Sequence, residues 1–169
     1  IGTDTLSKKL TPNALVNTLV LTEGNLKNLK VNFKKADSIP FYGFNFDDGK
    51  GVHVDNFSNR GNSGLPIGSF DVATMRAFHA KLDYDLIVLQ YGANVLNYGT
   101  LNYSWYEKRM AKVVAHLQEC FPGVTVLVIS TADKSTKYDM EMKTDSAVIP
   151  LNTAQKRYAI KSESSFVNM

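Results

Sequence analysis

The chain is short of cysteine, of net charge and of long hydrophobic runs, and each shortage excludes a class of protein. Cys120 is the only cysteine among the 169 residues, so the chain cannot form an internal disulfide. The formal net charge is only +3 and the lysines are scattered, which argues against a nucleic-acid partner. No apolar run approaches the ~20 residues that a bilayer-spanning helix needs. With 44% hydrophobic and 21% charged residues, the composition is that of a soluble globular protein.

Metal ligands and phosphate-binding loops are also scarce. The three histidines are scattered and form no His-x-x-x-His pair, so we expect neither a metal site nor a cofactor. His79 and His116 lie beside apolar helix positions and are expected to be structural, and Cys120 to be a buried spectator. The glycine-containing loop at 61–68 lacks the Gly-Lys-Ser/Thr sequence of a phosphate-binding loop.

The strongest pattern in the sequence is the apolar run Leu86–Gln90. It has no polar alternation before Gln90, which predicts a strand covered on both faces, as in a parallel sheet between helix layers. The run is followed directly by Tyr91-Gly92-Ala93-Asn94. Open α/β sheets bind their ligands at the carboxyl ends of such strands, so we expect the function of the chain to depend on this tetrapeptide.

Residues 1–57 have the composition of antiparallel strands. Candidate strands lie at 15–22, 26–33, 40–46 and 52–57, with turns at 23–25 and at 47–51, where glycines supply positive φ. We therefore expect residues 1–46 to be part of a β-sandwich and 47–169 to be an α/β domain.

From residue 52 onward the sequence alternates between strand and helix patterns. Asp71 is a helix N-cap candidate, Ser104 and Glu107 have the spacing of a capping box, and a last helix is expected from about Leu151 with Thr153 as its cap. Strands are predicted at 84–90 and 124–130, and a polar loop at 131–145. This order predicts a parallel sheet, covered on both faces, with right-handed crossovers.

Gly92-Ala93-Asn94 at the tip of a buried strand suits the stabilisation of an oxyanion. Glycine permits a sharp turn, and the Asn94 amide can donate to a negative oxygen without adding charge. Gly61, in the preceding loop, could bring a backbone N–H to the same place. The alternative is that Gly61 and Gly92 only permit tight turns and that Asn94 caps one of them.

A complete catalytic triad is not found within the chain. Ser63 lies in Gly61-Asn62-Ser63-Gly64, which misses the Gly-x-Ser-x-Gly spacing of a nucleophile elbow by one residue. A serine needs a nearby base to act as a nucleophile at neutral pH. By itself, this chain is therefore expected to be inactive as a serine hydrolase.

The segment from Val52 to Asn97 resembles the SGNH (GDSL-type) esterase and acylhydrolase family. Its loop glycine block corresponds to Asn59-Arg60-Gly61-Asn62 and its Gly-x-Asn block to Gly92-Ala93-Asn94, although Val95 stands where the family usually has an acidic residue. The β-rich start further resembles cell-wall O-acetylesterases of this family that carry an inserted β-sandwich.

This resemblance implies a three-layer, flavodoxin-like parallel-sheet domain, here incomplete and preceded by the antiparallel β-sandwich segment. It also implies a serine esterase that removes O-acetyl groups from a carbohydrate or cell-wall polymer, in an extracytoplasmic location. Gly61 and Asn94 would form the oxyanion hole, and Asn62, Gly92 and Ala93 would contact the ester substrate. The family's serine block and Asp-x-x-His block are absent, so we expect them before Ile1 and after Met169, in missing segments of the same protein.

Two other functions remain open from the sequence. In one, the chain is a non-catalytic module that presents aromatics such as Tyr42, Phe44 or Trp105 to glycans. In the other, it is a structural subunit that is completed by a partner chain.

Overall fold

The computed structural model describes residues 5–21 and 27–169, and these fall into two compact units. The first unit comprises Ile1–Lys9 with Leu19–Ser58, and the second comprises Leu10–Thr18 with Asn59–Met169. The sequence analysis expected a single boundary, after residue 46, whereas each compact unit takes in two separate stretches of the chain.

The described residues of the first unit form no strand, so the β-sandwich segment expected there is not present in them. The alternating residues Val52 and Val54 are 92% and 86% exposed, with no neighbouring strand to pair with. Short polar side chains bond the backbone locally instead, as where Asn56 Oδ1 accepts from Ser58 N at 2.8 Å. The turn at 47–51 does have its predicted positive φ, at Gly49 (71°) and Gly51 (79°). Residues 22–26, with the turn expected at 23–25, lie outside the described residues.

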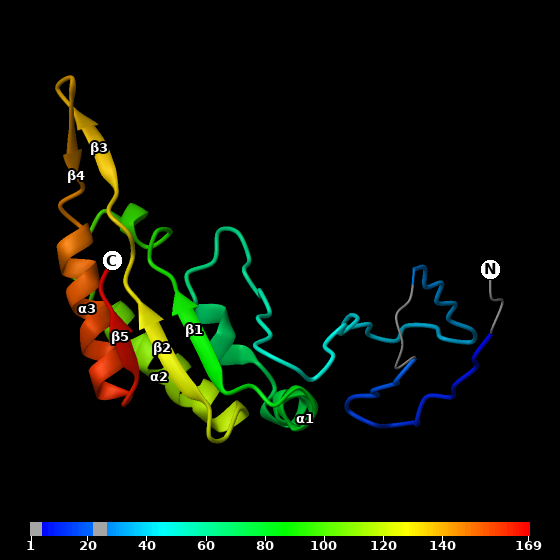
Figure 1. Cartoon of the computed structure of the whole chain (residues 1–169). Coiled ribbons are helices and arrows are strands. Elements are labelled where there is room, and N and C mark those ends of the chain that lie inside the picture. The colour runs from blue at the N-terminus through cyan, green and yellow to red at the C-terminus, as the bar shows by residue number, and fades with distance from the viewer. Residues whose placement is uncertain (1–4, 22–26) are drawn as a thin grey trace. The chain divides into compact units, whose positions relative to one another are not determined.

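The second unit is a mixed α/β structure (Figure 1). Its elements in chain order are η1 (Leu65–Ser69), α1 (Val72–Leu82), β1 (Leu86–Gln90), η2 (Leu96–Tyr98), α2 (Ser104–Cys120), β2 (Thr125–Ile129), β3 (Ser135–Tyr138), β4 (Glu141–Thr144), α3 (Val148–Lys161) and β5 (Ser165–Val167).

Strands β1, β2 and β5 form a parallel sheet in that order, as the alternation of strands and helices predicted. Leu86 pairs with Thr125, and Leu127 pairs with Ser165. The last strand, β5, was not predicted, because its run of three residues is too short to show a period.

The helices begin close to the predicted positions, with two corrections to their caps. Asp71 caps α1 by accepting from Thr74 N at 2.8 Å, as expected. Ser104 is the first residue of α2 rather than its cap, and Asn102 Oδ1 accepts from Ser104 N at 3.0 Å, so the capping box is not formed. Helix α3 begins at Val148, which places Thr153 inside the helix, where its hydroxyl donates to Ile149 O at 2.9 Å.

A hairpin replaces most of the polar loop that the sequence predicted at 131–145. Strands β3 and β4 pair antiparallel and are joined through Asp139 and Met140, both with positive φ (45° and 75°). Two successive residues with positive φ suit the right-handed twist of a tight hairpin. In Figure 1 the hairpin extends from one end of the sheet, beyond α3.

One face of the sheet is covered and the other is open, which corrects the prediction of a doubly covered sheet. On the covered face Leu89, Val126 and Val128 are 3%, 2% and 0% exposed. On the other face Leu86 and Val88 are each 49% exposed. The connections run in one direction, from β1 to β2 to β5, so crossovers of one hand place α2 and α3 on the same side. In keeping with this, Tyr106 of α2 and Tyr158 of α3 meet edge to face with ring centroids 6.3 Å apart.

Within the described ranges, every helix is too short or too polar to cross a membrane.

Candidate functional site

The turn after β1 is held in place by a glycine that no other residue could replace without a shift. Gly92 has φ 131°, and a Cβ added there would lie 2.8 Å from Thr131 Cβ. Its carbonyl oxygen accepts from Val95 N at 2.7 Å and from Leu96 N at 3.2 Å, which closes a tight turn. Asn94 is therefore exposed at the tip of a turn whose first residue, Gly92, is buried.

Gln155 of α3 bonds the backbone just beyond the ends of β1 and β2, next to this turn. Its Nε2 donates to Tyr91 O at 2.7 Å and its Oε1 accepts from Thr131 N at 2.9 Å. The side chain is 0% exposed, so it satisfies two backbone groups that water does not reach. The sequence analysis missed this residue. The available signal was a glutamine one helical turn after Leu151, on the apolar side of α3.

The loop with Gly61 is anchored to the same end of β1. Gly64 lies so close to Tyr91 that a Cβ at Gly64 would meet the tyrosine ring at 3.0 Å. The Tyr106 hydroxyl of α2 donates to Ser63 O at 2.9 Å. Burial raises the pKa of Tyr106 well above its usual value, so its hydroxyl remains a proton donor across the physiological range.

The two loops meet at Asn94. Its Nδ2 donates to the carbonyl oxygen of Asn62 at 3.0 Å, immediately after Gly61. Gly61 has φ 79°, and Asn62 Oδ1 accepts from Gly64 N at 2.7 Å, so the loop is a compact turn. The loop that contains Gly61 and the turn that carries Asn94 thus lie against each other at the carboxyl end of β1.

The arrangement leaves two neutral donors free. An asparagine amide carries two N–H groups, and the bond to Asn62 O uses one of them. Among the hydrogen bonds of the described residues, none uses the Gly61 N–H. Of the residues expected to contact substrate, Asn62 is half-buried and Ala93 exposed, whereas Gly92 is buried beneath Thr131 and Gln155.

In each histidine of the second unit, the ring nitrogen Nε2 lies against a main-chain carbonyl. His79 Nε2 lies 3.1 Å from Pro122 O, and His116 Nε2 lies 2.8 Å from Phe70 O. Because a carbonyl oxygen only accepts, each of these nitrogens carries its proton and cannot act as a base. Within residues 5–21 and 27–169 no histidine is bonded to the Ser63 hydroxyl.

Cys120 is buried, and burial is the main cause that raises the pKa of its thiol, so it is a poor nucleophile.

One group of metal-type ligands was not foreseen. Asp47, Asp48 and His53 of the first unit each place a ligand atom within 4.8 Å of the others. His53 Nε2 lies 2.7 Å from Asp47 Oδ1, and all three residues are exposed. These residues could hold a divalent ion, but the contact between His53 and Asp47 already accounts for their closeness.

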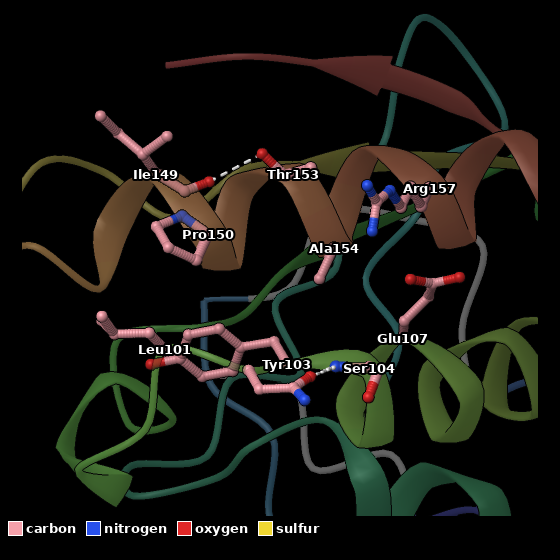
Figure 2. Close-up of a pocket in the computed structure, with 10 residues that line it drawn as sticks. Leu101, Tyr103, Ser104, Glu107, Ile149, Pro150, Thr153, Ala154 and Arg157 are labelled. Atoms are coloured by element: carbon pink, nitrogen blue, oxygen red, sulfur yellow. Dashed lines mark hydrogen bonds between the residues drawn. The ribbon is translucent and has the colours of Figure 1, made fainter.

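Two hollows lie beside the helices of the second unit, away from the residues predicted to be functional. The first, of about 410 Å³, lies between the start of α2 and α3. Figure 2 shows Glu107 and Arg157 on opposite sides of it, with Tyr103 and Leu101 at its end. The second, of about 440 Å³, is lined by α2 and by Lys161 and Ser162. Neither hollow is lined by Gly61 or Asn94, and both of these residues are exposed on the surface.

Comparisons with protein-family models, with curated proteins and with solved structures find no match to this chain.

Proposed function

We propose that the chain is the oxyanion-binding half of an SGNH-type serine esterase that removes O-acetyl groups from a carbohydrate or cell-wall polymer. The observation that carries the proposal is the 3.0 Å hydrogen bond from Asn94 Nδ2 to Asn62 O. It joins the two loops whose sequences resemble the family's blocks, at the end of a parallel strand where α/β folds bind ligands.

The chemistry would be acyl transfer in two steps. A serine oxygen forms a bond to the acyl carbon, the carbonyl oxygen becomes negative, and the sugar hydroxyl then leaves with a proton passed on by histidine. Water hydrolyses the acyl-enzyme in the second step. The Gly61 N–H and the free N–H of Asn94 would hold the negative oxygen in both steps, and each such donor typically lowers the barrier by about 2.7–4 kcal/mol.

The proposal is supported by the anchoring of the two loops, which needs no substrate. Gly64 lies against Tyr91, Tyr106 donates to Ser63 O, and Gln155 fixes the end of β1. Donors that need no rearrangement at the moment of reaction stabilise a transition state more effectively than mobile ones.

The nucleophile and base must come from outside residues 1–169 in this proposal. Neither a Gly-Asp-Ser nor an Asp-x-x-His block of the family's kind lies where it is needed in the sequence. Of the histidines, His79 and His116 are bonded to carbonyls, as described above.

A non-catalytic glycan-binding module is the second candidate function. It is favoured by the exposed aromatics of the first unit, among them Tyr42 (58% exposed) and Phe44 (48% exposed). In this alternative the two joined loops have only a structural role.

The experiment that separates the two functions compares two polypeptides. The first is residues 1–169, and the second is the same sequence extended by its native coding sequence on both sides. We expect the extended protein to hydrolyse p-nitrophenyl acetate and to release acetate from acetylated xylan, and residues 1–169 to do neither. If the extended protein folds and binds xylan without releasing acetate, the esterase proposal is wrong and the binding module is favoured.

A further inference from the structure

An exposed pair of stacked aromatic rings lies on the segment that leads away from the candidate site. Tyr98 and Trp105 are parallel, with an interplanar angle of 2° and ring centroids 5.5 Å apart. Tyr98 is 58% exposed, while Trp105 is partly buried against the hydrophobic core. The inner ring is thus held by the protein, and the outer ring is open to solvent.

The position of this pair is coupled to the turn that carries Asn94. Val95 N donates to Gly92 O at 2.7 Å, and Tyr98 N donates to Val95 O at 3.2 Å, so consecutive turns run from Gly92 to Tyr98. Val95 and Leu96 are 0% and 5% exposed and anchor these turns in the core. Tyr98 therefore lies on the same run of hydrogen-bonded turns as Asn94.

Two further contacts hold the inner ring, Trp105, in place. Trp105 meets Tyr106 edge-on at 5.6 Å, and the Arg109 guanidinium carbon lies 5.7 Å from the Trp105 ring centroid. A cation close to an indole ring is attracted to its π-electrons, which helps to hold both side chains. A ligand that binds here would meet preordered rings, so little side-chain entropy would be lost on binding.

We infer that Tyr98, backed by Trp105, is a sugar-binding platform that holds a pyranose ring of the polysaccharide next to the ester to be cleaved. One face of a pyranose carries C–H groups that pack against an aromatic ring, while its hydroxyls stay at the edge, in contact with water. The site is an open surface rather than a cavity, which suits a long polymer that passes over it. The link to the cleaved ester rests on the proposed function, whereas sugar binding by itself does not.

The chain offers an internal reporter for this inference, because Trp105 is its only tryptophan. We would titrate the 169-residue chain with acetylated xylan, deacetylated xylan, mannan and chitin oligosaccharides, and follow the emission of Trp105. We expect a saturable change with at least one of them, confirmed by calorimetry. Tyr98→Ala should weaken that binding by roughly 10-fold or more, and Tyr98→Phe should preserve it.

Phe70→Ala is the matched control, since it removes an exposed aromatic ring of the second unit that neither binding proposal uses and should leave the affinity unchanged. Equal melting temperatures of the variants would show that Tyr98→Ala does not act through folding. The inference is overturned if no polysaccharide gives a saturable change, or if Tyr98→Ala binds as tightly as the unaltered chain. Ester hydrolysis by the extended protein without binding at Tyr98 would overturn this inference alone, and binding at Tyr98 without hydrolysis would overturn the esterase alone.

Discussion

The two faces of the β1–β2–β5 sheet are built from the same apolar residue types but have different surroundings. Leu89, on the face that the helices cover, is 3% exposed, whereas Leu86, on the same strand and the opposite face, is 49% exposed. The difference follows from the direction of the chain, since both crossovers advance from β1 towards β5 and leave their helices on one side. An apolar run shows that a strand can be covered on both faces, but the strand order decides whether it is.

The largest expected difference in stability is between two variants in which a leucine is truncated, one on each face of the sheet. Leu89→Ala should lower the free energy of unfolding by about 2–5 kcal/mol, because it leaves a cavity in the packed layer. Leu86→Ala should lower it by about 1 kcal/mol or less, because half of the side chain is already in water. Urea unfolding followed by circular dichroism measures both. Equal losses would contradict the description of two different faces.

The next largest loss of stability is expected from replacing Gln155, which makes two hydrogen bonds to the ends of neighbouring strands. Gln155→Leu keeps the size of the side chain but leaves Tyr91 O and Thr131 N without partners, so it should cost about 1–3 kcal/mol. Gln118→Leu is the control, because that side chain is only partly buried and makes one bond, to Ser162 O at 3.1 Å. Denaturation of the two variants side by side would show whether Gln155 has the greater effect, and a loss no larger than that of Gln118→Leu would count against the proposed fixation of the strand ends.

A smaller effect is expected where the helix layer anchors the Gly61 loop. Tyr106→Phe removes the hydroxyl that donates to Ser63 O and should cost about 0.5–1.5 kcal/mol. Tyr103 is also buried, but its hydroxyl has no hydrogen-bond partner in the described structure, so Tyr103→Phe should cost nothing or be slightly stabilising. Differential scanning calorimetry can measure the loss of stability in each variant. If Tyr103→Phe is the more destabilising of the two, Tyr106 is not the residue that anchors the Gly61 loop.

The local features of the fold could be predicted from the sequence. The apolar face of α2, with Tyr106, Met110 and Leu117 buried, follows from the helical spacing of its residues. Asp71 was recognised as a cap because only its own helix is needed to interpret it. The positive φ of Gly123 (88°) after α2 belongs to the same class of local signal.

Two other kinds of feature could not be predicted: those whose usual local signal is missing, and those that depend on distant parts of the chain. The β3–β4 hairpin turns at Asp139-Met140, which lacks the glycine or asparagine that usually marks such a turn. Strand composition at 52–57 did not produce a strand, because a strand must pair along its backbone with another strand, and the described residues of the first unit form none.

The candidate site was predicted in part. Gly61 and Asn94 were chosen from their loops and their family resemblance, and the structure places these loops together. The residues that hold the site, Gln155 and Tyr106, bond backbone groups that lie between 24 and 64 residues away in the sequence, so the sequence did not indicate those partners.

The turnover of the extended protein with Asn94→Ala is the most direct test of the central claim, that Asn94 and Gly61 stabilise a negative oxygen. With p-nitrophenyl acetate, we expect kcat and kcat/KM to fall together by about 10²–10³-fold, because the donor acts on the transition state. Asn56→Ala, which removes an exposed asparagine with one local bond in the first unit, should leave both unchanged. If Asn94→Ala turns over the ester at the rate of the unaltered protein while folding normally, the oxyanion assignment is contradicted.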